Sequence, residues 1–401
     1  MRIDEFIEYF LDIPVSINNL YGDPFFPTQI ENTFSKLDEL QKDGHKGIVS
    51  IITKTEITNQ IASRLSQYTS CLNLIVLVSI SELPFEIEKI KGFRYNTLKL
   101  CNEYNIPCLA YVRPFIPNEN TSPETIDTIF RNIKNAGTNV VVVSGLRGGD
   151  DILKNLDIKP EEFDKWSMRV KIIPAEVRKA LEECREKYDM TMFERTSCGV
   201  TYVLGKVHSY NPYYASPQLA RCGRCPLKTS CFDKQFKFVP SEKDLELVRL
   251  LGYNADIVNG GHFELCKTDP AKRTECVSCC TSCFRLERTA IKIQHFDDQK
   301  ICLGDIGLLR LLTKKLVFCK GVIDSGDSTI AHPKNPFLAD SNLYILNSWS
   351  SFSRNTGNCY RCSYCIVPTF KNLNQEYGAS PRKVGKALVR KLQEKGVIFD
   401  E

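Results

Sequence analysis

Two runs of aliphatic residues constrain the fold of this chain more than any other feature. Leu74–Val78 and Val140–Val143 are apolar at every position, so a strand formed by either run presents apolar side chains on both faces. Strands of this kind belong to parallel sheets that are covered by helices, whereas a half-exposed strand alternates apolar and polar residues. The two runs therefore predict an α/β fold in the first half of the chain.

Six strands and five intervening helices are predicted in that half. The strands are expected at Pro14–Asn18, Gly47–Thr53, Leu74–Ser81, Cys108–Phe115, Asn139–Ser144 and about Met190–Arg195. The helices are expected at Gln29–Lys42, Glu56–Gln67, Tyr95–Tyr104, Pro123–Ala136 and Pro174–Tyr188. Six units are fewer than the eight of a closed barrel. They suit a six-unit partial (β/α) barrel, which we predict, or an open doubly wound sheet.

Polar residues at the carboxyl ends of these strands are the candidate ligand-binding residues. In both architectures ligands bind at this end of the strands. The predicted ligand pocket contains Asp23, Thr53, Lys54, Ser79, Ser81, Arg113, Ser144 and Glu194.

Five short motifs in the same region support a family resemblance. They are Tyr21–Phe25, Ile51–Lys54, Arg113–Asn118, Val142–Leu146 and Arg195–Cys198. In order and placement they resemble the barrel of radical S-adenosylmethionine proteins, closest to the spore photoproduct lyase-like branch, over about residues 10–235. The resemblance implies a six-unit partial barrel and raises S-adenosylmethionine as a ligand.

The sequence departs from that family at its reactive iron site. Family members hold the cluster that cleaves S-adenosylmethionine in a Cys-x3-Cys-x2-Cys loop ahead of a motif like the one that begins at Tyr21. The three expected positions here are Ile13, Ile17 and Leu20, and no cysteine precedes Cys71. Thiolates are the usual iron–sulfur ligands, and aliphatic side chains have no lone pair to offer. The usual cluster therefore cannot form there, and the barrel is predicted to be degenerate as a radical enzyme.

Cysteines elsewhere are abundant and unevenly placed. Of the 18 cysteines in 401 residues, four precede residue 190 and fourteen lie between Cys198 and Cys365. This content is too low for a disulfide scaffold, and closely spaced thiolates are typical of metal sites. The predicted metal ligands are Cys198, Cys222, Cys225 and Cys231 in a first group, Cys266, Cys276, Cys279, Cys280 and Cys283 in a second, and Cys359, Cys362 and Cys365 in a third.

The metal at these groups stays open between iron–sulfur and zinc, because spacing alone does not separate them. The first group resembles the auxiliary iron–sulfur motif that follows the barrel in many radical S-adenosylmethionine proteins, which favours a [4Fe-4S] cluster. The second also contains the register Cys276-x3-Cys280-x2-Cys283 of the radical cluster, although it follows the barrel instead of the first strand. A closed four-thiolate site can equally be a structural staple.

The domain limits follow from these features. We predict a radical-SAM-like barrel over 1–197, a cysteine-rich auxiliary cluster segment over 198–240 and a cysteine-rich, metal-binding α+β domain over 241–401. Helices are expected at 241–251, after the N-cap Ser241, and over Pro381–Gly396, where Val384, Leu388 and Leu392 form an apolar stripe on an otherwise basic helix.

Composition limits the cellular setting and the partners. No stretch reaches the roughly 18 uncharged apolar residues of a membrane span, and the N-terminus lacks the pattern of a secretory signal. We therefore expect a cytoplasmic protein without a membrane partner. The net charge of +5 does not by itself indicate a nucleic-acid binder, but the basic helix keeps nucleic acid open as a partner.

Two functions fit these observations. The first is an iron–sulfur or zinc metalloprotein on a degenerate radical-SAM-like barrel, an enzyme or enzyme component whose C-terminal clusters carry electrons or position a substrate. The alternative is a non-catalytic protein that binds a ligand, a protein or a nucleic acid and holds structural zinc. The substrate and the protein partner are not specified by the sequence.

Overall fold

The computed structural model describes residues 1–17, 22–89, 92–146, 154–155, 173, 175–193, 196–206, 239–258, 290–294, 309, 312–313, 317–319 and 380–401. The chain divides into two compact units. The sheet unit comprises Pro14–Lys42 and Gly47–His208, and the terminal unit comprises Met1–Ile13, Asp43–Lys46 and Ser209–Glu401. The first thirteen residues thus group with the C-terminal part of the chain, whereas the predicted limits placed them with the barrel.

The sheet unit contains six parallel strands, which confirms the predicted α/β fold. They are β1 (Val15–Ile17), β2 (Ile48–Thr53), β3 (Asn73–Ile80), β4 (Cys108–Phe115), β5 (Val140–Gly145) and β6 (Thr191–Phe193). Their order in the sheet is the order in the sequence, and each strand pairs in parallel with the next. The two aliphatic runs lie within β3 and β5, and all their residues except the partly buried Val140 are buried, so both faces of these strands are covered.

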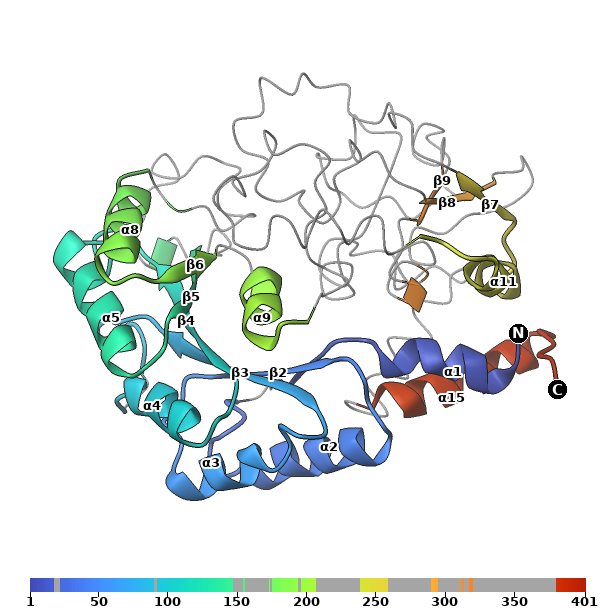
Figure 1. Ribbon diagram of the computed structural model, residues 1–401, viewed down its shortest axis with the longest axis horizontal. Coiled ribbons are helices and arrows are strands. Elements are labelled where there is room, and N and C mark those ends of the chain that lie inside the picture. Colours follow the sequence, from blue (N-terminus) through green and yellow to red (C-terminus); the bar gives the residue numbers. More distant parts are fainter. Residues whose placement is uncertain are drawn as a thin grey trace. The chain divides into compact units, whose positions relative to one another are not determined.

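Five helices alternate with these strands at the predicted places. They are α2 (Ile30–Lys42), α3 (Asn59–Ser66), α4 (Tyr95–Glu103), α5 (Pro123–Asn135) and α8 (Ala175–Lys187). A right-handed crossover in a sheet whose strand order never reverses places each helix on the same face. Figure 1 shows the five helices along the sheet. Accordingly, residues from all five share one hydrophobic cluster with alternate strand residues such as Val76 and Val78 of β3.

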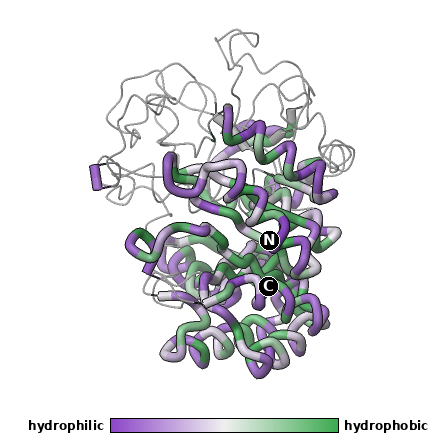
Figure 2. Tube along the Cα trace, turned by 90° about the vertical axis from the view of Figure 1, so that its left-hand side faces the viewer, coloured by the Kyte–Doolittle hydropathy of each residue, from purple (hydrophilic) through white to green (hydrophobic). Residues whose placement is uncertain are grey.

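The ends of these helices follow local sequence signals. Ser122 caps α5 by accepting a hydrogen bond from Thr125 N at 3.1 Å, and Pro123 occupies the first turn, as predicted. Thr58 caps α3 in the same way. Along the described helices hydrophobic and hydrophilic residues alternate with the helical period (Figure 2).

A further helix, α9 (Thr196–Leu204), lies on the opposite face of the sheet. Gly199 makes this packing possible, because a Cβ built there would lie 2.5 Å from Val142 Cγ2 and 3.2 Å from Leu109 Cδ2. Both residues belong to the alternate set of strand positions that faces away from the five crossover helices. We call this side of the sheet the inner face.

The terminal unit joins the two ends of the described chain. Helix α1 (Ile3–Leu11) packs along α15 (Pro381–Glu394) (Figure 1). Phe6, Phe10 and Leu388 are fully buried in the hydrophobic cluster that the two helices share. Gly385 allows a close approach, since a Cβ there would lie 3.0 Å from the Phe10 ring. The predicted apolar stripe of the C-terminal helix is therefore confirmed as its buried face.

The other described elements of this unit are α11 (Glu242–Leu250) and the strands β7 (Ala255–Val258), β8 (Ala290–Ile293) and β9 (Val317–Cys319). β7 pairs antiparallel with β8, and β8 pairs in parallel with β9. Ser241 and Asp244 form a capping box at the start of α11, in agreement with the predicted helix at 241–251.

The short segment Asp43–Lys46 also belongs to this unit. Lys46 N donates to Leu11 O at 2.8 Å, and Ser380 donates its hydroxyl proton to the Asp43 carboxylate at the start of α15. His45 is buried, and neither of its ring nitrogens has a hydrogen-bond partner within the described part of the chain. Burial lowers the pKa of His45 to about 4, although Asp12 and Asp43 act in the opposite direction.

No helix in the described ranges is both long and apolar enough to cross a membrane. Most residues of the predicted segments 198–240 and 241–401 fall outside the described ranges, so their limits remain predictions.

Candidate functional site

The predicted ligand-binding residues lie at the carboxyl ends of neighbouring strands. Register places Val78 beside Thr53 and Ser79 beside Tyr111, so Lys54, Ser79 and Tyr111 follow one another across β2, β3 and β4. Side chains alternate between the two faces along a strand. The strand neighbours Val78, Val112 and Val143 belong to the core under the crossover helices, so Ser79, Arg113 and Ser144 lie on the inner face. By the same alternation Lys54 and Tyr111 lie on this face.

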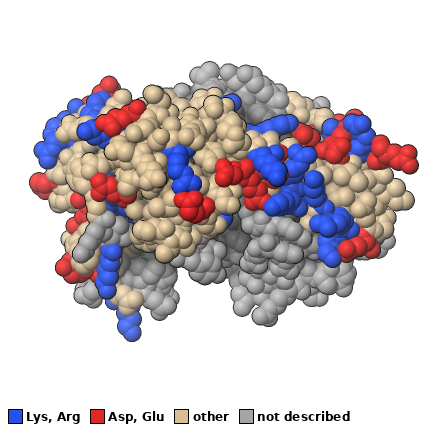
Figure 3. Space-filling model, turned by 90° about the horizontal axis from the view of Figure 1, so that it is seen from below, with Lys and Arg blue, Asp and Glu red and all other residues tan. Residues whose placement is uncertain are grey.

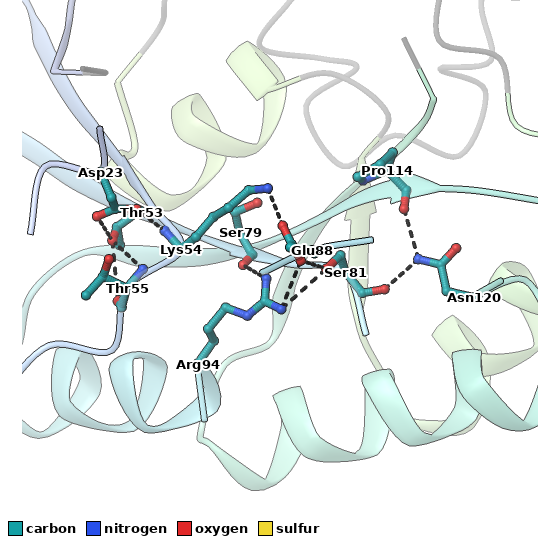
Figure 4. Close-up of polar contacts among 10 residues, drawn as sticks. All are labelled: Asp23, Thr53, Lys54, Thr55, Ser79, Ser81, Glu88, Arg94, Pro114 and Asn120. Atoms are coloured by element: carbon teal, nitrogen blue, oxygen red, sulfur yellow. Dashed lines mark hydrogen bonds and ion pairs between the residues drawn. The ribbon is translucent and has the colours of Figure 1, made fainter. Parts of the chain in front are cut away.

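Asp23 and Thr53 hold the loop after β1 against the end of β2. The Asp23 carboxylate accepts hydrogen bonds from Thr53 Oγ1 at 2.6 Å and from Lys54 N (Figure 4). It also accepts from Phe25 N at 3.0 Å. Thr53 is fully buried. Both carboxylate oxygens of Asp23 are occupied by the protein, so these two predicted residues hold the loop and the strand end together.

Glu88 lies at the centre of a buried charge cluster. Its carboxylate accepts hydrogen bonds from Lys54 Nζ and Ser81 Oγ, and from Arg94 Nη2 at 3.1 Å (Figure 4). Arg94 also donates from Nη1 to the Ser79 carbonyl at 3.0 Å. The Glu88 and Arg94 side chains are 7% and 11% exposed, whereas Lys54 is 39% exposed, so Lys54 is the solvent-facing member.

The ionisation of Glu88 follows from these contacts. Burial alone would raise the pKa of its carboxyl group, but hydrogen bonds from Lys54 and Ser81 and the positive charge of Arg94 outweigh burial and lower the pKa. Glu88 is therefore ionised near neutral pH, and it neutralises only part of the charge of Lys54 and Arg94.

Asn120 fixes the loop that follows β4. Its side-chain amide donates to Pro114 O at 2.9 Å and to Ser81 O, and Asn120 Oδ1 accepts from Ile116 N at 2.7 Å. The loop after β4 is thus tied to the end of β3 (Figure 4).

Arg113 and Tyr111 connect β4 to α9. The Arg113 guanidinium lies 4.1 Å from the centre of the Tyr111 ring, and Tyr111 Oη lies 2.7 Å from Thr196 Oγ1. Within the described part of the chain no carboxylate pairs with Arg113. Ser144 is buried at the end of β5. Glu194 lies outside the described residues.

Ser79 differs from the other described ligand-binding candidates in its buried hydroxyl group, which is unpaired within the described ranges. Its side chain is 1% exposed, and its hydroxyl has no hydrogen-bond partner among the residues that the structure describes. A buried hydroxyl without a partner costs about 1–3 kcal/mol, so such groups are normally satisfied by protein, water or ligand.

Sequence reasoning missed Glu88, Arg94 and Asn120. All three lie in loops after the strands, so the search for polar residues at the strand ends themselves did not reach them. The loop after β3 does carry a signal, since Glu88 and Arg94 are opposite charges that follow a strand buried on both faces.

The predicted metal ligands are largely outside the described residues. Cys198 is the exception and lies buried in α9. The other eleven cysteines of the three groups, Cys222, Cys225, Cys231, Cys266, Cys276, Cys279, Cys280, Cys283, Cys359, Cys362 and Cys365, are not described. Among the described residues, no group of three or more His, Cys, Asp and Glu side chains is placed to hold a metal ion.

Comparison with known proteins finds no protein-family model that matches the chain and no curated protein that resembles it.

Proposed function

We propose that this chain is a metalloprotein whose sheet unit is a partial (β/α) barrel that binds an anionic ligand at the carboxyl ends of β2–β4. Two properties of the sheet support the partial barrel: its strand order never reverses, and its five crossover helices share one face. A doubly wound sheet would contain a reversal of strand order.

The Ser79 hydroxyl is the observation that carries the ligand site. It is buried on the inner face, has no described partner, and lies in register between Lys54 and Tyr111. A ligand oxygen accepting its proton would remove the cost of burying it unpaired.

Charge at the same edge favours an anionic ligand. Lys54 and Arg94 share the carboxylate of Glu88, and Arg113 is a further cation without a carboxylate partner in the described part of the chain. Lys54 is partly exposed, and Arg113 lacks a described carboxylate partner. Both can therefore reach an anionic group of a ligand, such as a carboxylate or a phosphate.

The three cysteine groups fit a metal centre by the chemistry of their donors. Thiolates bind zinc and iron–sulfur clusters, and the first group begins in α9, the helix packed on the inner face. The proposal includes a [4Fe-4S] cluster or zinc at these groups. Such a centre would supply electron transfer in the first case and local stability in the second.

The reactive cluster of radical S-adenosylmethionine enzymes does not fit at the start of this chain. Ile17 is 3% exposed within the core under the crossover helices, and Ile13 packs in the terminal unit. This packing favours the second candidate function, a non-catalytic ligand-binding protein with structural zinc. We include an enzymatic role only through clusters held by the later cysteines.

Metal analysis and an absorption spectrum of anaerobically purified protein test the proposal. Iron with broad absorption near 400 nm supports the iron–sulfur form, whereas zinc in a colourless preparation supports the second candidate. Reductive cleavage of S-adenosylmethionine to a deoxyadenosyl product would establish the enzyme. A full-length, folded preparation without bound metal would contradict the metalloprotein proposal.

Ligand binding is tested separately by thermal shift with inorganic phosphate and with S-adenosylmethionine, whose carboxylate belongs to the proposed class. We expect a higher melting temperature for the natural chain and a smaller shift for Ser79→Ala. Ser50→Ala, in the body of β2, serves as the matched control. No shift with either compound, or equal shifts in all three proteins, would contradict the ligand site.

A further inference from the structure

Four of the six exposed residues of α15 are basic. Lys383, Lys386, Arg390 and Lys391 are exposed on this helix, and Lys395 follows directly after it. Glu394 is the one acidic residue of the helix, and it pairs with Lys391 at 2.8 Å. Figure 3 shows Lys and Arg side chains gathered on the surface where α15 lies.

The apolar face of α15 is buried in the terminal unit. Val384, Leu388 and Leu392 are at most 4% exposed and pack in the core of the terminal unit with Phe6 and Phe10 of α1. A helix that binds a bilayer buries its apolar face in the lipid. Because that face is occupied, insertion of α15 into a membrane would require the unit to open.

The basic residues oppose the stability of the helix that carries them. Arg382 and Lys383 occupy the first turn, where the helix dipole favours acidic side chains. The helix itself has no acidic residue there, and the one described carboxylate at this end is that of Asp43, which accepts from the N-cap Ser380. The pairs Arg382 with Lys386 and Lys386 with Arg390 are like charges four residues apart. Each such pair destabilises an isolated helix by about 0.2–0.5 kcal/mol. Arg382 does contribute to the fold, because its Nη1 donates to Asp43 O at 3.1 Å. The repulsion between Lys386 and Arg390 brings the helix no stability of its own.

The same face lacks the features of a protein interface. Such interfaces have a core of aromatic or aliphatic anchors, and the exposed residues of α15 are Lys383, Lys386, Arg390, Lys391, Gln393 and Glu394. Aromatic side chains, on which single-stranded bases stack, are also missing from these exposed positions. What remains is a row of long cationic side chains, the group that contacts phosphates.

We propose that α15 binds the phosphate backbone of double-stranded nucleic acid. Lys383, Lys386 and Arg390 span about 10 Å along the helix at 1.5 Å per residue. Measured along the axis of a duplex, that length corresponds to the rise of about three phosphates of one strand, at 3.4 Å of axis each. The surface lies in the terminal unit and does not depend on the ligand or metal sites proposed above. Binding is electrostatic and independent of base sequence.

Fluorescence anisotropy with the full chain and two labelled 20-bp duplexes of unrelated sequence tests this proposal. The main variant is Lys383→Gln/Lys386→Gln/Arg390→Gln, and the control is Lys99→Gln/Arg131→Gln/Lys179→Gln, which removes the same charge from exposed helix positions of the sheet unit. We expect the main variant to weaken binding of both duplexes at least tenfold and the control to change it less than twofold.

Salt dependence gives an independent measurement. Loss of three phosphate contacts is expected to reduce the slope of log affinity against log salt by about 2.7, at about 0.9 per contact. Equal weakening by the two triple variants would show that only net charge matters and would overturn the proposal. No binding to duplex at low salt would also overturn it.

Two further probes separate other polyanions from nucleic acid. Vesicles containing phosphatidylserine and a poly-glutamate peptide are tested at the same charge concentration. Binding to either probe as tightly as to duplex, with the same loss in the main variant, would contradict a nucleic-acid surface. Unchanged circular dichroism and melting temperature confirm that the main variant is folded, as expected for exposed positions.

Discussion

At the scale of single residues, the site depends on one carboxylate that serves two cations. Glu88 joins Lys54 and Arg94 and also accepts from Ser81, so the loop after β3 and the end of β2 share one buried charge. The value of such a cluster lies mainly in keeping each buried charge paired, because an unpaired buried charge is far more costly than the pair is stabilising.

Replacement Glu88→Gln is therefore expected to be destabilising. It leaves Arg94, 11% exposed, without its carboxylate and should lower the free energy of unfolding by roughly 2–4 kcal/mol. Lys54→Gln is the matched comparison: Lys54 is 39% exposed, so the loss should stay below about 1 kcal/mol. Urea denaturation measures both, and equal losses would show that the burial of Arg94 is not what matters.

Acid stability depends on the same group. The pKa of Glu88 is lowered from the ordinary 4.5 in the folded state, so its ionised form stabilises the fold above that pH. The contribution is lost as pH falls below 4.5 and through the lowered pKa. Stability curves between pH 6 and 3 should accordingly be less steep below pH 4.5 for Glu88→Gln than for the natural chain.

His45 gives a second pH dependence in a higher range. Its folded-state pKa of about 4 lies below the ordinary 6.5, so the unfolded chain binds a proton first as pH falls. Stability is complete above about pH 6.5 and declines by up to about 3 kcal/mol as pH falls to about 4. His45→Gln should remove this decline in denaturation curves at pH 7, 6 and 5. A decline that persists in the variant would assign it to other groups.

At the scale of elements, the contact between α9 and the inner face depends on one missing side chain. Gly199→Ala places a methyl group 2.5 Å from Val142 Cγ2 and 3.2 Å from Leu109 Cδ2, so the surrounding side chains or the helix must shift. We expect a loss of about 1–3 kcal/mol, as for other overpacked cores. Adding Val142→Ala removes the clashing methyl, so the double variant should be more stable than the sum of the single changes predicts. Strict additivity, measured by thermal denaturation, would contradict the described contact.

The helices and strands were largely predictable because their signals are local. The apolar runs of β3 and β5 and the caps at Ser122 and Ser241 act within a few residues of the elements they define. α1 was missed, although Phe6, Ile7, Phe10 and Leu11 have helical spacing, because its apolar face is completed by a helix near the other end of the chain.

The location of the site could be predicted from the sequence, but its hydrogen bonds and ion pairs could not. Parallel strands bring their carboxyl ends together, so Lys54, Ser79 and Arg113 could be expected at one edge. The partners Glu88 and Arg94 come from a loop whose course depends on tertiary contacts, and no periodic pattern specifies it. Burial of the Ser79 hydroxyl without a described partner likewise follows from packing and not from sequence.

At the scale of the whole molecule, the terminal unit is built from segments that lie far apart in the sequence, since Met1–Ile13 belongs to the same unit as α15. Removal of Met1–Ile13 would expose Val384, Leu388 and Leu392 of α15, each of which gains about 1.5–3 kcal/mol from full burial. We expect amide hydrogens of α15 to exchange much faster in the deleted chain, while those of β3 stay protected. Equal loss of protection in both elements would show that the two units do not unfold separately.

The pairing of α1 with α15 has a consequence for synthesis on the ribosome. At about 5–20 residues per second, α1 is synthesised about 20–75 s before α15. The sheet unit, whose neighbours in space are neighbours in sequence, can assemble during this interval. During this time Phe6 and Phe10 lack their partner helix, so α1 exposes apolar side chains that a chaperone can bind until α15 has been synthesised.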